Sequence, residues 1–420
     1  METAPRRVML LTTPTSYRTA AFLQAAQRLG IETLVVEDTP APLQQFLPLR
    51  FTADFRDTAR ATERIAEIAR QYGVRAVIPV DDSGTVLAAL IAQRLGLPSN
   101  DPDAALAARD KWIMRQRLAA AGVPSPRAQA FPALADMTSL ARSMSFPCVV
   151  KPTRLSGSRG VIRADDPVSF VRAVERIRSI LTSDGIDLRT AELVAEPFVP
   201  GFEVAVEGLL TDGAFRLLAL FDKPDPLDGP FFEETIYVTP SRLPPAVQDE
   251  IVAATAKAAR ALGLRTGPVH AELRVNEAGP WVIELAGRSI GGLCSRILEF
   301  DTGLSLEELI LAHAVGEQLA GLERRPDAVG VMMIPIPRAG ILKDVEGIEE
   351  ASSVPGITGI EITVKRNHRI VPLPEGASYL GFIFARGSDP TEVETALRFA
   401  HARLRIRIAP ELPVLGVYTT

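Results

Sequence analysis

The sequence predicts an α/β domain with a doubly wound parallel sheet, followed by an α+β region and a small C-terminal α+β lobe. Strand and helix patterns alternate at the N-terminal end, and short β-rich runs replace them after the linker at 123–126. The chain has 420 residues, 47% of them hydrophobic, which exceeds what one core usually organises. We therefore expect two to four packed subdomains.

Composition excludes several classes of protein. The net charge is −5 and Lys and Arg are not concentrated in any run, so DNA or RNA would gain little long-range attraction. Cys148 and Cys294 are the only thiols; they are too few for a disulfide framework and fit two small buried residues in a reducing compartment. The apolar run 8–11 is too short for a signal peptide, and no stretch reaches bilayer length. We expect a cytoplasmic protein with neither nucleic acid nor membrane as partner.

Repeated β-α-β units predict the parallel sheet. The expected elements are strands at 8–11, 31–36 and 76–80 and helices at 20–29, 61–72, 85–95 and 101–121. In such a sheet the strand ends form a ligand crevice. The first turn, 12–18, contains no glycine, which argues against a dinucleotide-binding dehydrogenase. Asp81 and Asp82 end a strand where functional groups often lie, although a helix cap beginning at Asp82 or Ser83 explains them equally well.

Short β-rich runs and helices alternate in the rest of the chain. The expected elements are strands at 148–151, 160–164, 194–198, 203–210, 216–221, 331–336, 357–364 and 379–385, and helices at 168–181, 248–262 and 390–404.

Lys151 and the loop 156–160, Ser-Gly-Ser-Arg-Gly, form the first candidate site. Small residues let backbone N–H groups turn toward one point, and hydroxyls with a nearby Lys add donors for phosphate oxygens. The lysine precedes the loop and a strand follows it, so the pattern is strand-loop-strand, unlike a P-loop. An ordinary hairpin with a flexible turn explains the same residues.

Glu272 and Glu284 form the second candidate, in an expected hairpin whose turn lies at 276–280. Pairing that is symmetric about Ala278 would place the two carboxylates opposite each other, with Cβ atoms about 5 Å apart. Such a pair persists if it is exposed, if one member is protonated, or if a cation such as nucleotide-bound magnesium lies between them. A solvated hairpin edge is the alternative, and a one-residue bulge would spoil this register.

Two further segments carry weaker signals. Arg288 lies in a glycine-rich loop directly after Glu284, where it can neutralise a transferring phosphoryl group or can simply be a surface arginine. The segment 196–203 reads as a strand followed by a tight turn, whose backbone can bond an adenine while Glu203 bonds the ribose.

In this order, the four segments resemble the ATP-grasp superfamily, and the resemblance spans nearly the whole chain. It implies a pre-ATP-grasp Rossmann-like domain at 1–103, a small subdomain with the phosphate loop at 104–190, a large subdomain with the metal site at 191–327, and a C-terminal lobe at 328–420. The positions it implies for ATP and metal are Lys111 and Lys151 as nucleotide-binding lysines, Ser156, Gly157, Ser158 and Gly160 as phosphate loop, Glu196, Phe198 and Val199 as adenine clamp, Glu203 at the ribose, and Glu272 and Glu284 as magnesium ligands.

Segments 283–288, 333–340 and 379–382 look most like L-amino acid ligases, which form dipeptides. The resemblance therefore implies an ATP-dependent carboxylate–amine ligase that works through an acyl phosphate, releases ADP and phosphate, and uses one or two Mg²⁺, with Mn²⁺ as a substitute. Many members have Asn two residues after the second metal carboxylate, where this chain has Ala286, so the second ion is held less fully.

The resemblance implies Arg288 as the arginine that contacts the reacting phosphate. His270 is expected either to bond an acyl oxygen or to be a structural histidine. Substrate contacts are expected from Lys223, Glu233, Glu234, Ser289, Gly291 and Gly292. Three alternatives stay open: a biotin-carboxylase-like enzyme acting on bicarbonate, a purine-pathway ligase, and a nucleotide-binding regulator without turnover. Whether the chain acts as a homodimer is also open.

Overall fold

The computed structural model describes residues 6–39 and 49–411 and divides the chain into two compact units. The first unit comprises Met1–Ala130, Val194–Asp222 and Thr239–Pro326, and the second comprises Phe131–Leu193, Lys223–Val238 and Asp327–Thr420. Both units are therefore built from stretches that alternate along the sequence. The four predicted segments stay a prediction.

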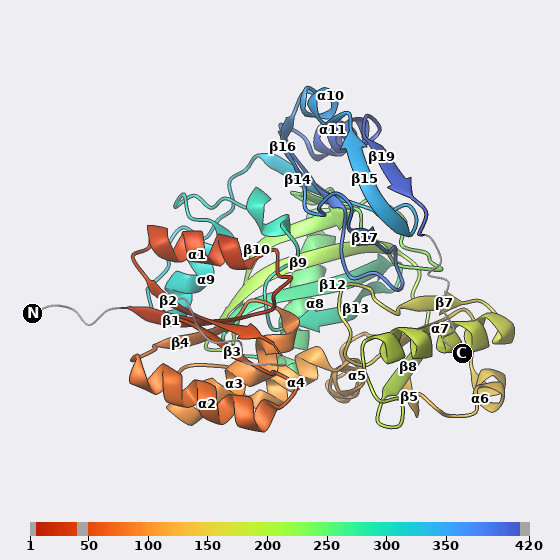
Figure 1. Cartoon of the computed structure of the whole chain (residues 1–420), viewed down its shortest axis with the longest axis horizontal. Coiled ribbons are helices and arrows are strands. Elements are labelled where there is room, and N and C mark those ends of the chain that lie inside the picture. Colours follow the sequence, from red (N-terminus) through yellow and green to blue (C-terminus); the bar gives the residue numbers. More distant parts are fainter. Residues whose placement is uncertain (1–5, 40–48, 412–420) are drawn as a thin grey trace, which may run out of the picture. The chain divides into compact units, whose positions relative to one another are not determined.

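The first unit begins with a four-stranded parallel sheet in the order β3-β2-β1-β4. Helix α1 lies on one face, and α2 and α3 lie on the other (Figure 1). The bounds are β1 Arg7–Thr12, α1 Thr19–Arg28, β2 Glu32–Asp38, β3 Arg50–Ala53, α2 Thr58–Gln71, β4 Ala76–Pro79 and α3 Thr85–Leu95. The predicted doubly wound sheet is confirmed, and the short strand β3 is an addition that the sequence did not indicate.

Strands β13-β12-β9-β10 follow in that order in the first unit. Their bounds are β9 Phe202–Thr211, β10 Ala214–Lys223, β12 Gly267–Asn276 and β13 Gly279–Ala286. One face of β9, β12 and β13 packs on α8 (Pro245–Leu262) in a core that includes Val204, Leu273 and Leu285. The opposite face is thereby left for polar side chains, because neighbouring residues in a strand point to opposite faces.

The helix predicted over 101–121 is wrong in one respect, because it breaks at Asp110. Helix α4 spans Pro102–Arg109 and α5 spans Lys111–Ala120. Asp110 has an extended backbone, and its carboxylate accepts hydrogen bonds from the N–H groups of Trp112 and Ile113. An Asp that caps a new helix competes with helix continuation, and here it places Lys111 at the first residue of α5.

The second unit contains the other sheets. β5 (Gln129–Pro132) enters the unit and β8 (Glu192–Pro197) leaves it, in a sheet of order β5-β8-β6-β7 with β6 Cys148–Pro152 and β7 Ile162–Ala164. Helices α6 (Met137–Ser143) and α7 (Pro167–Ser183) pack against each other. The unit also holds β11 Ile236–Thr239, β14 Ala328–Ile334, β15 Gly340–Glu346, α10 Ile348–Ser352, β16 Ile357–Ile362, β17 Arg369–Ile370, β18 Gly381–Gly387, α11 Pro390–His401 and β19 Arg405–Ala409.

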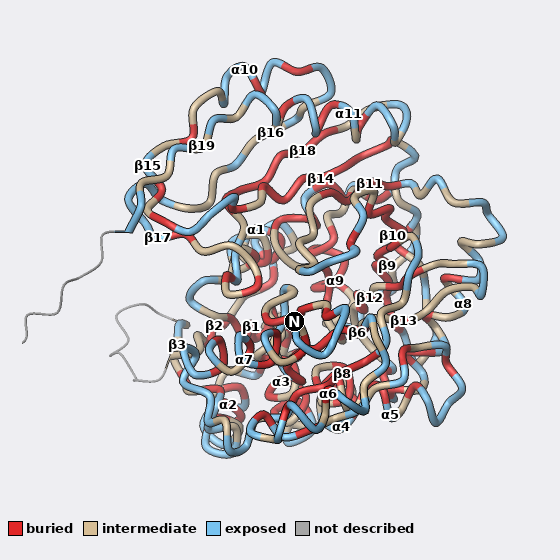
Figure 2. Tube along the Cα trace, turned by 90° about the vertical axis from the view of Figure 1, so that its right-hand side faces the viewer, coloured by how far each residue is buried: buried red, intermediate tan, exposed pale blue. Residues whose placement is uncertain are grey.

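Within this unit, β11-β14-β18-β16 run in that order, and β17-β15-β19 form a separate three-stranded sheet. Strands β14 and β18 are buried along most of their length (Figure 2), where they pack with α11. The predicted α+β character of this region is confirmed.

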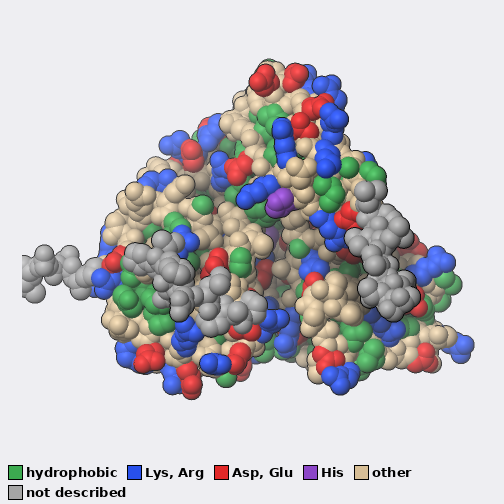
Figure 3. Space-filling model, viewed as in Figure 1, with side chains coloured by type: hydrophobic (Ala, Val, Ile, Leu, Met, Phe, Trp, Pro, Cys, Tyr) green, Lys and Arg blue, Asp and Glu red, His purple; other side chains and the backbone are tan. Residues whose placement is uncertain are grey.

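The surface and the helices agree with the composition. On the face shown in Figure 3, acidic and basic side chains are interspersed. Within residues 6–39 and 49–411, no helix is both long enough and hydrophobic enough to cross a bilayer. Cys148 and Cys294 are both buried free thiols, as predicted.

The break at Asp110 gives a prediction with a matched control. Asp101 caps α4 as Asp110 caps α5, so Asp101→Ala and Asp110→Ala should each lower the free energy of unfolding by about 1 kcal/mol. Only Asp110→Ala should also weaken the ATP binding that the sequence resemblance implies, because it frees the first turn that carries Lys111. Urea unfolding and calorimetric titration with ATP measure the two effects. Equal ATP affinity in both variants would contradict this assignment.

Candidate active site

The polar face of β9, β12 and β13 carries a grid of charged side chains. Residues two apart in each strand share a face, and the strand register aligns them in three rows: Glu203 with Arg274; Ala205 with Glu272 and Glu284; and Glu207 with His270 and Ala286. The small side chains of Ala205 and Ala286 flank the acidic pair and the histidine. The sheet therefore brings Glu203, His270, Glu272 and Glu284 together on one face, and the sequence predicted this for Glu272 and Glu284.

The opposed carboxylates are confirmed, but the symmetric pairing expected about Ala278 is wrong. Next to the turn, the strands pair symmetrically about a point between Glu277 and Ala278, with Asn276 opposite Gly279 and Leu273 opposite Val282. If this register continued, Ile283 would lie opposite Glu272. The register then shifts between Glu272 and Leu273, which leaves Glu284 opposite Glu272. The bulge that was expected to spoil the pair therefore creates it, in keeping with the frequency of bulges beside active sites.

Two basic side chains flank the acidic pair. Nζ of Lys111 lies 3.4 Å from a Glu284 oxygen, and Nε2 of His270 lies 3.8 Å from a Glu272 oxygen. The side chains of Glu272 and Glu284 are 24% and 33% exposed, so solvent and ligands reach both. Accessible carboxylate oxygens on neighbouring strands are the donors that Mg²⁺ accepts together with phosphate and water oxygens. The residues therefore fit a magnesium–nucleotide complex.

Glu207 lies behind His270 and was missed by the sequence analysis. Its Oε2 lies 3.2 Å from Nδ1 of His270 and accepts a hydrogen bond from the Ile290 N–H at 3.0 Å. Burial raises the pKa of Glu207 despite these contacts. Burial also opposes the charged form of His270, but the carboxylates of Glu207 and Glu272 outweigh it and raise the pKa of His270.

Ion pairs hold the segment that the sequence assigned to the adenine and ribose. Glu196 forms a bidentate pair with Arg115, at 2.9 and 3.2 Å, with both side chains buried. Arg274 pairs with Glu203 at 2.9 Å, stacks over the Phe198 ring and donates to the Val199 carbonyl at 2.9 Å. The carboxylates and the Val199 carbonyl thus already serve to fix this turn.

The two arginines of these pairs were missed as well. A buried, bidentate pair is costly to break because it leaves an uncompensated charge, at about 3–5 kcal/mol. The alternation of polar and apolar residues in β12 places Arg274 on the same face as Glu272 and was an available signal.

Arg288 is oriented by the N-terminal sheet. Its guanidinium donates two hydrogen bonds to Asp82, at 2.8 and 2.7 Å, and one to the Ser289 carbonyl at 2.9 Å. Burial disfavours both charges, but the contact between them outweighs it, raising the pKa of Arg288 and lowering the pKa of Asp82. The alternative of a turn and helix cap at this position holds in part: a short helix begins at Asp82, but no side chain caps it or α3.

Arg18 reinforces the same loop. It is buried and donates to the Val80 carbonyl at 2.8 Å, to the Ser289 carbonyl at 3.3 Å and to the Ser289 hydroxyl. The ends of β1 and β4 therefore hold residues 288 and 289 in place.

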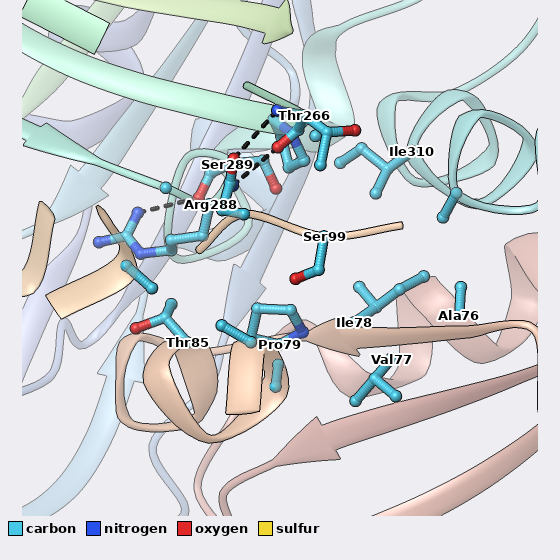
Figure 4. A pocket seen from close by; sticks show the side chains of 18 of the residues that line it. Ala76, Val77, Ile78, Pro79, Thr85, Ser99, Thr266, Arg288, Ser289 and Ile310 are labelled. Atoms are coloured by element: carbon cyan, nitrogen blue, oxygen red, sulfur yellow. Dashed lines mark hydrogen bonds between the residues drawn. The ribbon is translucent and has the colours of Figure 1, made fainter. Parts of the chain in front are cut away.

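A pocket lies on the other side of this loop, with a volume of about 120 Å³. Its walls include β4, α3, the start of β12 and α9 (Leu306–Ala314). Figure 4 shows Ile78, Pro79 and Ile310 around it, while the guanidinium of Arg288 is turned away from these side chains. Residues 287–289 thus line this pocket, which has both polar and apolar walls, while the Arg288 side chain pairs with Asp82.

The second unit carries Lys151 and the candidate phosphate loop. Lys151 is buried in β6, which pairs antiparallel with β7, so the predicted strand-loop-strand arrangement is confirmed. Gly157, Ser158 and Gly160 have φ values of 63°, 55° and 66°, left-handed conformations that bend the loop sharply.

The end of this loop is tethered. Arg159 donates to both carboxylate oxygens of Asp184, at 2.7 and 2.9 Å, and to the Glu375 carbonyl. The N–H of Gly160 bonds the Pro374 carbonyl at 3.0 Å. The exposed Ser156 and Gly157 precede these tethers.

Two of the three predicted substrate residues of the second unit, Lys223 and Glu234, contact each other. Lys223 pairs with Glu234 and lies over the Tyr237 ring. Burial raises the pKa of Glu233, against a backbone hydrogen bond from Ile336. The structure thus places Lys223, Glu233, Glu234, Lys151 and residues 156–160 in the second unit, and Lys111, Glu196, Phe198, Val199, Glu203, His270, Glu272, Glu284, Arg288, Ser289, Gly291 and Gly292 in the first.

Comparisons with known families cover most of the chain. Residues 144–297 match the ATP-grasp domain, residues 309–409 match the L-amino acid ligase C-terminal domain 2, and residues 23–99 match the ATP-grasp N-terminal domain. A crystal structure of an L-amino acid ligase from Bacillus licheniformis is similar to this chain with a TM-score of 0.83 and 26% identity, covering 97% of this chain and 100% of that one.

Two relatives with named activities match this chain over only part of their own length. The alanine–anticapsin ligase of Bacillus subtilis is 28% identical over 59% of this chain and 56% of its own length. Carnosine synthase 1 of Gallus gallus is 30% identical over 79% of this chain and 38% of its own length. The chain thus spans about half the length of the first relative and less of the second.

Proposed function

Because this chain belongs to the ATP-grasp superfamily and is a ligase that forms C–N bonds, we propose that it joins the carboxylate of one amino acid, or amino-acid-like molecule, to the amine of another. The superfamily uses ATP and Mg²⁺. The observation that carries the proposal is the opposed pair Glu272 and Glu284, with Lys111 beside Glu284. A sheet face with this arrangement suits a nucleotide-bound divalent cation.

The reaction follows from what these groups can stabilise. A substrate carboxylate oxygen attacks the γ-phosphorus of ATP, the bond to the β-phosphate oxygen breaks, and an acyl phosphate and ADP form. The amine then attacks the acyl carbon, loses a proton and displaces phosphate. Phosphoryl transfer requires mainly positioning and charge neutralisation, which explains a site rich in cations and carboxylates without a nucleophilic side chain.

Each residue has a role in this proposal. Glu272 and Glu284 hold Mg²⁺, which supplies neutralisation of phosphate charge. Lys111 and Lys151 bind nucleotide phosphates, and the loop 156–160 binds phosphate oxygens and shields the acyl phosphate from water. Arg288, held by Asp82, stabilises the transferring phosphoryl group, and His270 donates to the acyl oxygen.

Nucleotide and substrate recognition use the remaining residues. The segment from Glu196 to Val199 holds the adenine and Glu203 holds the ribose. Glu233 or Glu234 receives a substrate ammonium, and Ser289, Gly291 and Gly292 allow close approach by the substrate backbone. Glu234 pairs with the Lys223 ammonium in this structure, so a substrate ammonium at Glu234 would share or displace that contact.

Release of ADP and phosphate across a panel of amino acids tests the reaction. We expect release that requires Mg²⁺ and two amino acids together, with a dipeptide detected by mass spectrometry. Dependence on bicarbonate in place of the second amino acid would instead indicate a carboxylase. ATP binding without any release would contradict the proposal and favour a regulatory protein.

Substitution of one carboxylate tests the metal assignment. Glu284→Gln should lower the turnover number at least about 100-fold, since metal neutralisation is worth several kcal/mol, with little change in the melting temperature. Glu277→Gln removes an exposed carboxylate from the turn of the same hairpin and should retain activity. Equal activity of the two variants would refute the assignment.

A further inference from the structure

A buried carboxylate outside the proposed reaction lies behind His270. Glu207 is 0% exposed. It lies in β9, directly opposite His270 in β12. Its Oε2 contacts both Nδ1 of His270, at 3.2 Å, and the N–H of Ile290, at 3.0 Å. One oxygen atom therefore connects β12 to the loop that follows β13.

This carboxylate is costly for the fold. Removing a carboxylate from water is unfavourable unless its partners compensate, and apolar residues at such positions are often as stable or more stable. Burial raises the pKa of Glu207 even with its partners present. Fold stability is thus a poor explanation for an acid at this place.

The contacts of Glu207 instead fix a direction. A histidine ring turns about two side-chain bonds, and a hydrogen bond at Nδ1 determines where Nε2 points. With Nδ1 toward Glu207, Nε2 of His270 lies on the side of Glu272, 3.8 Å from its carboxylate. The same oxygen holds Ile290, two residues after Arg288.

We propose that Glu207 is a positioning residue, which orients the ring of His270 against the loop 288–292 so that Nε2 meets the acyl oxygen of the substrate. The inference rests on the proposed function for the identity of that substrate. It assigns to Glu207 an effect on turnover that acts through His270.

A double-mutant cycle separates this role from a structural one. Glu207→Gln keeps an oxygen acceptor of similar size and should lower the turnover number about 10- to 100-fold, as loss of an orienting partner typically does, with the KM for ATP changed less than about twofold. His270→Gln should cost at least as much. In the His270→Gln background, Glu207→Gln should cost little more, because groups that act as a unit are not additive.

Glu308 offers a matched control. It is a buried carboxylate of the same unit that binds Arg28 and the N–H of Ser305 in the cap of α9. Glu308→Gln removes a buried charge but should leave the turnover number within about twofold of wild type, since Gln also serves in a capping box. An equal loss of turnover in both Gln variants would overturn the proposal.

NMR of the imidazole nitrogens detects how the His270 ring is held, independently of enzyme turnover. With ¹⁵N-labelled histidine and the His270→Gln variant for assignment, the wild type should show a protonated Nδ1 at His270, and Glu207→Gln should change that signal. An unchanged signal, or additive losses in the cycle, would overturn the proposal. If wild type releases no ADP with any substrate pair, the proposed function fails, and the NMR result alone decides whether Glu207 orients His270.

Discussion

Repulsion between Glu272 and Glu284 is the constraint on which the rest of the first unit depends. Like charges directly opposite each other in a sheet destabilise it, and here the bulge at Ile283 enforces the opposition. Lys111 and His270 flank the pair. These contacts make the arrangement tolerable in the free protein, and we propose that a nucleotide-bound divalent cation completes it.

Each basic side chain near this pair is positioned by another residue, either a carboxylate that contacts it or the residue that caps its helix. Asp82 holds Arg288, Glu207 holds His270, and Glu203 holds Arg274. Asp110 starts the helix whose first residue is Lys111. Such partners restrict side-chain freedom before substrate binds, which is the physical basis of preorganisation.

The N-terminal parallel sheet supports this site through its strand ends. Asp82 follows β4, and Arg18, which precedes α1, bonds Ser289. The crevice at the strand ends of such a sheet often binds a ligand. In this chain the same place supplies side chains that position a loop, which agrees with the lack of a glycine fingerprint at residues 12–18.

Much of the fold was readable from sequence because its patterns are local. Amphipathic helices and alternating strands gave the elements of the parallel sheet and the hairpin of Glu272 and Glu284. The bulge at Ile283 was unreadable, because a turn of the composition at 276–280 permits more than one register. Strands β15 and β17 carry charged residues and little alternation, while β19 has a clear alternation that was overlooked directly after α11.

Partners distant in sequence were the other limit. Glu196 and Glu203 were recognisable as candidate site residues, but their pairing with Arg115 and Arg274 depends on how strands and helices pack. Asp82 and Arg288 are similarly far apart in the chain. Periodicity predicts which face a side chain occupies and cannot name the charge that meets it from another element.

Direct measurement of metal binding tests the central claim. Mn²⁺ can be titrated into the protein with a non-hydrolysable ATP analogue and followed by electron paramagnetic resonance, for wild type and for a Glu272→Gln, Glu284→Gln double variant. The account predicts a tightly bound ion in the wild-type complex and at least about 10-fold weaker binding in the variant. Equal affinity in the two proteins would show that the opposed carboxylates do not hold the metal.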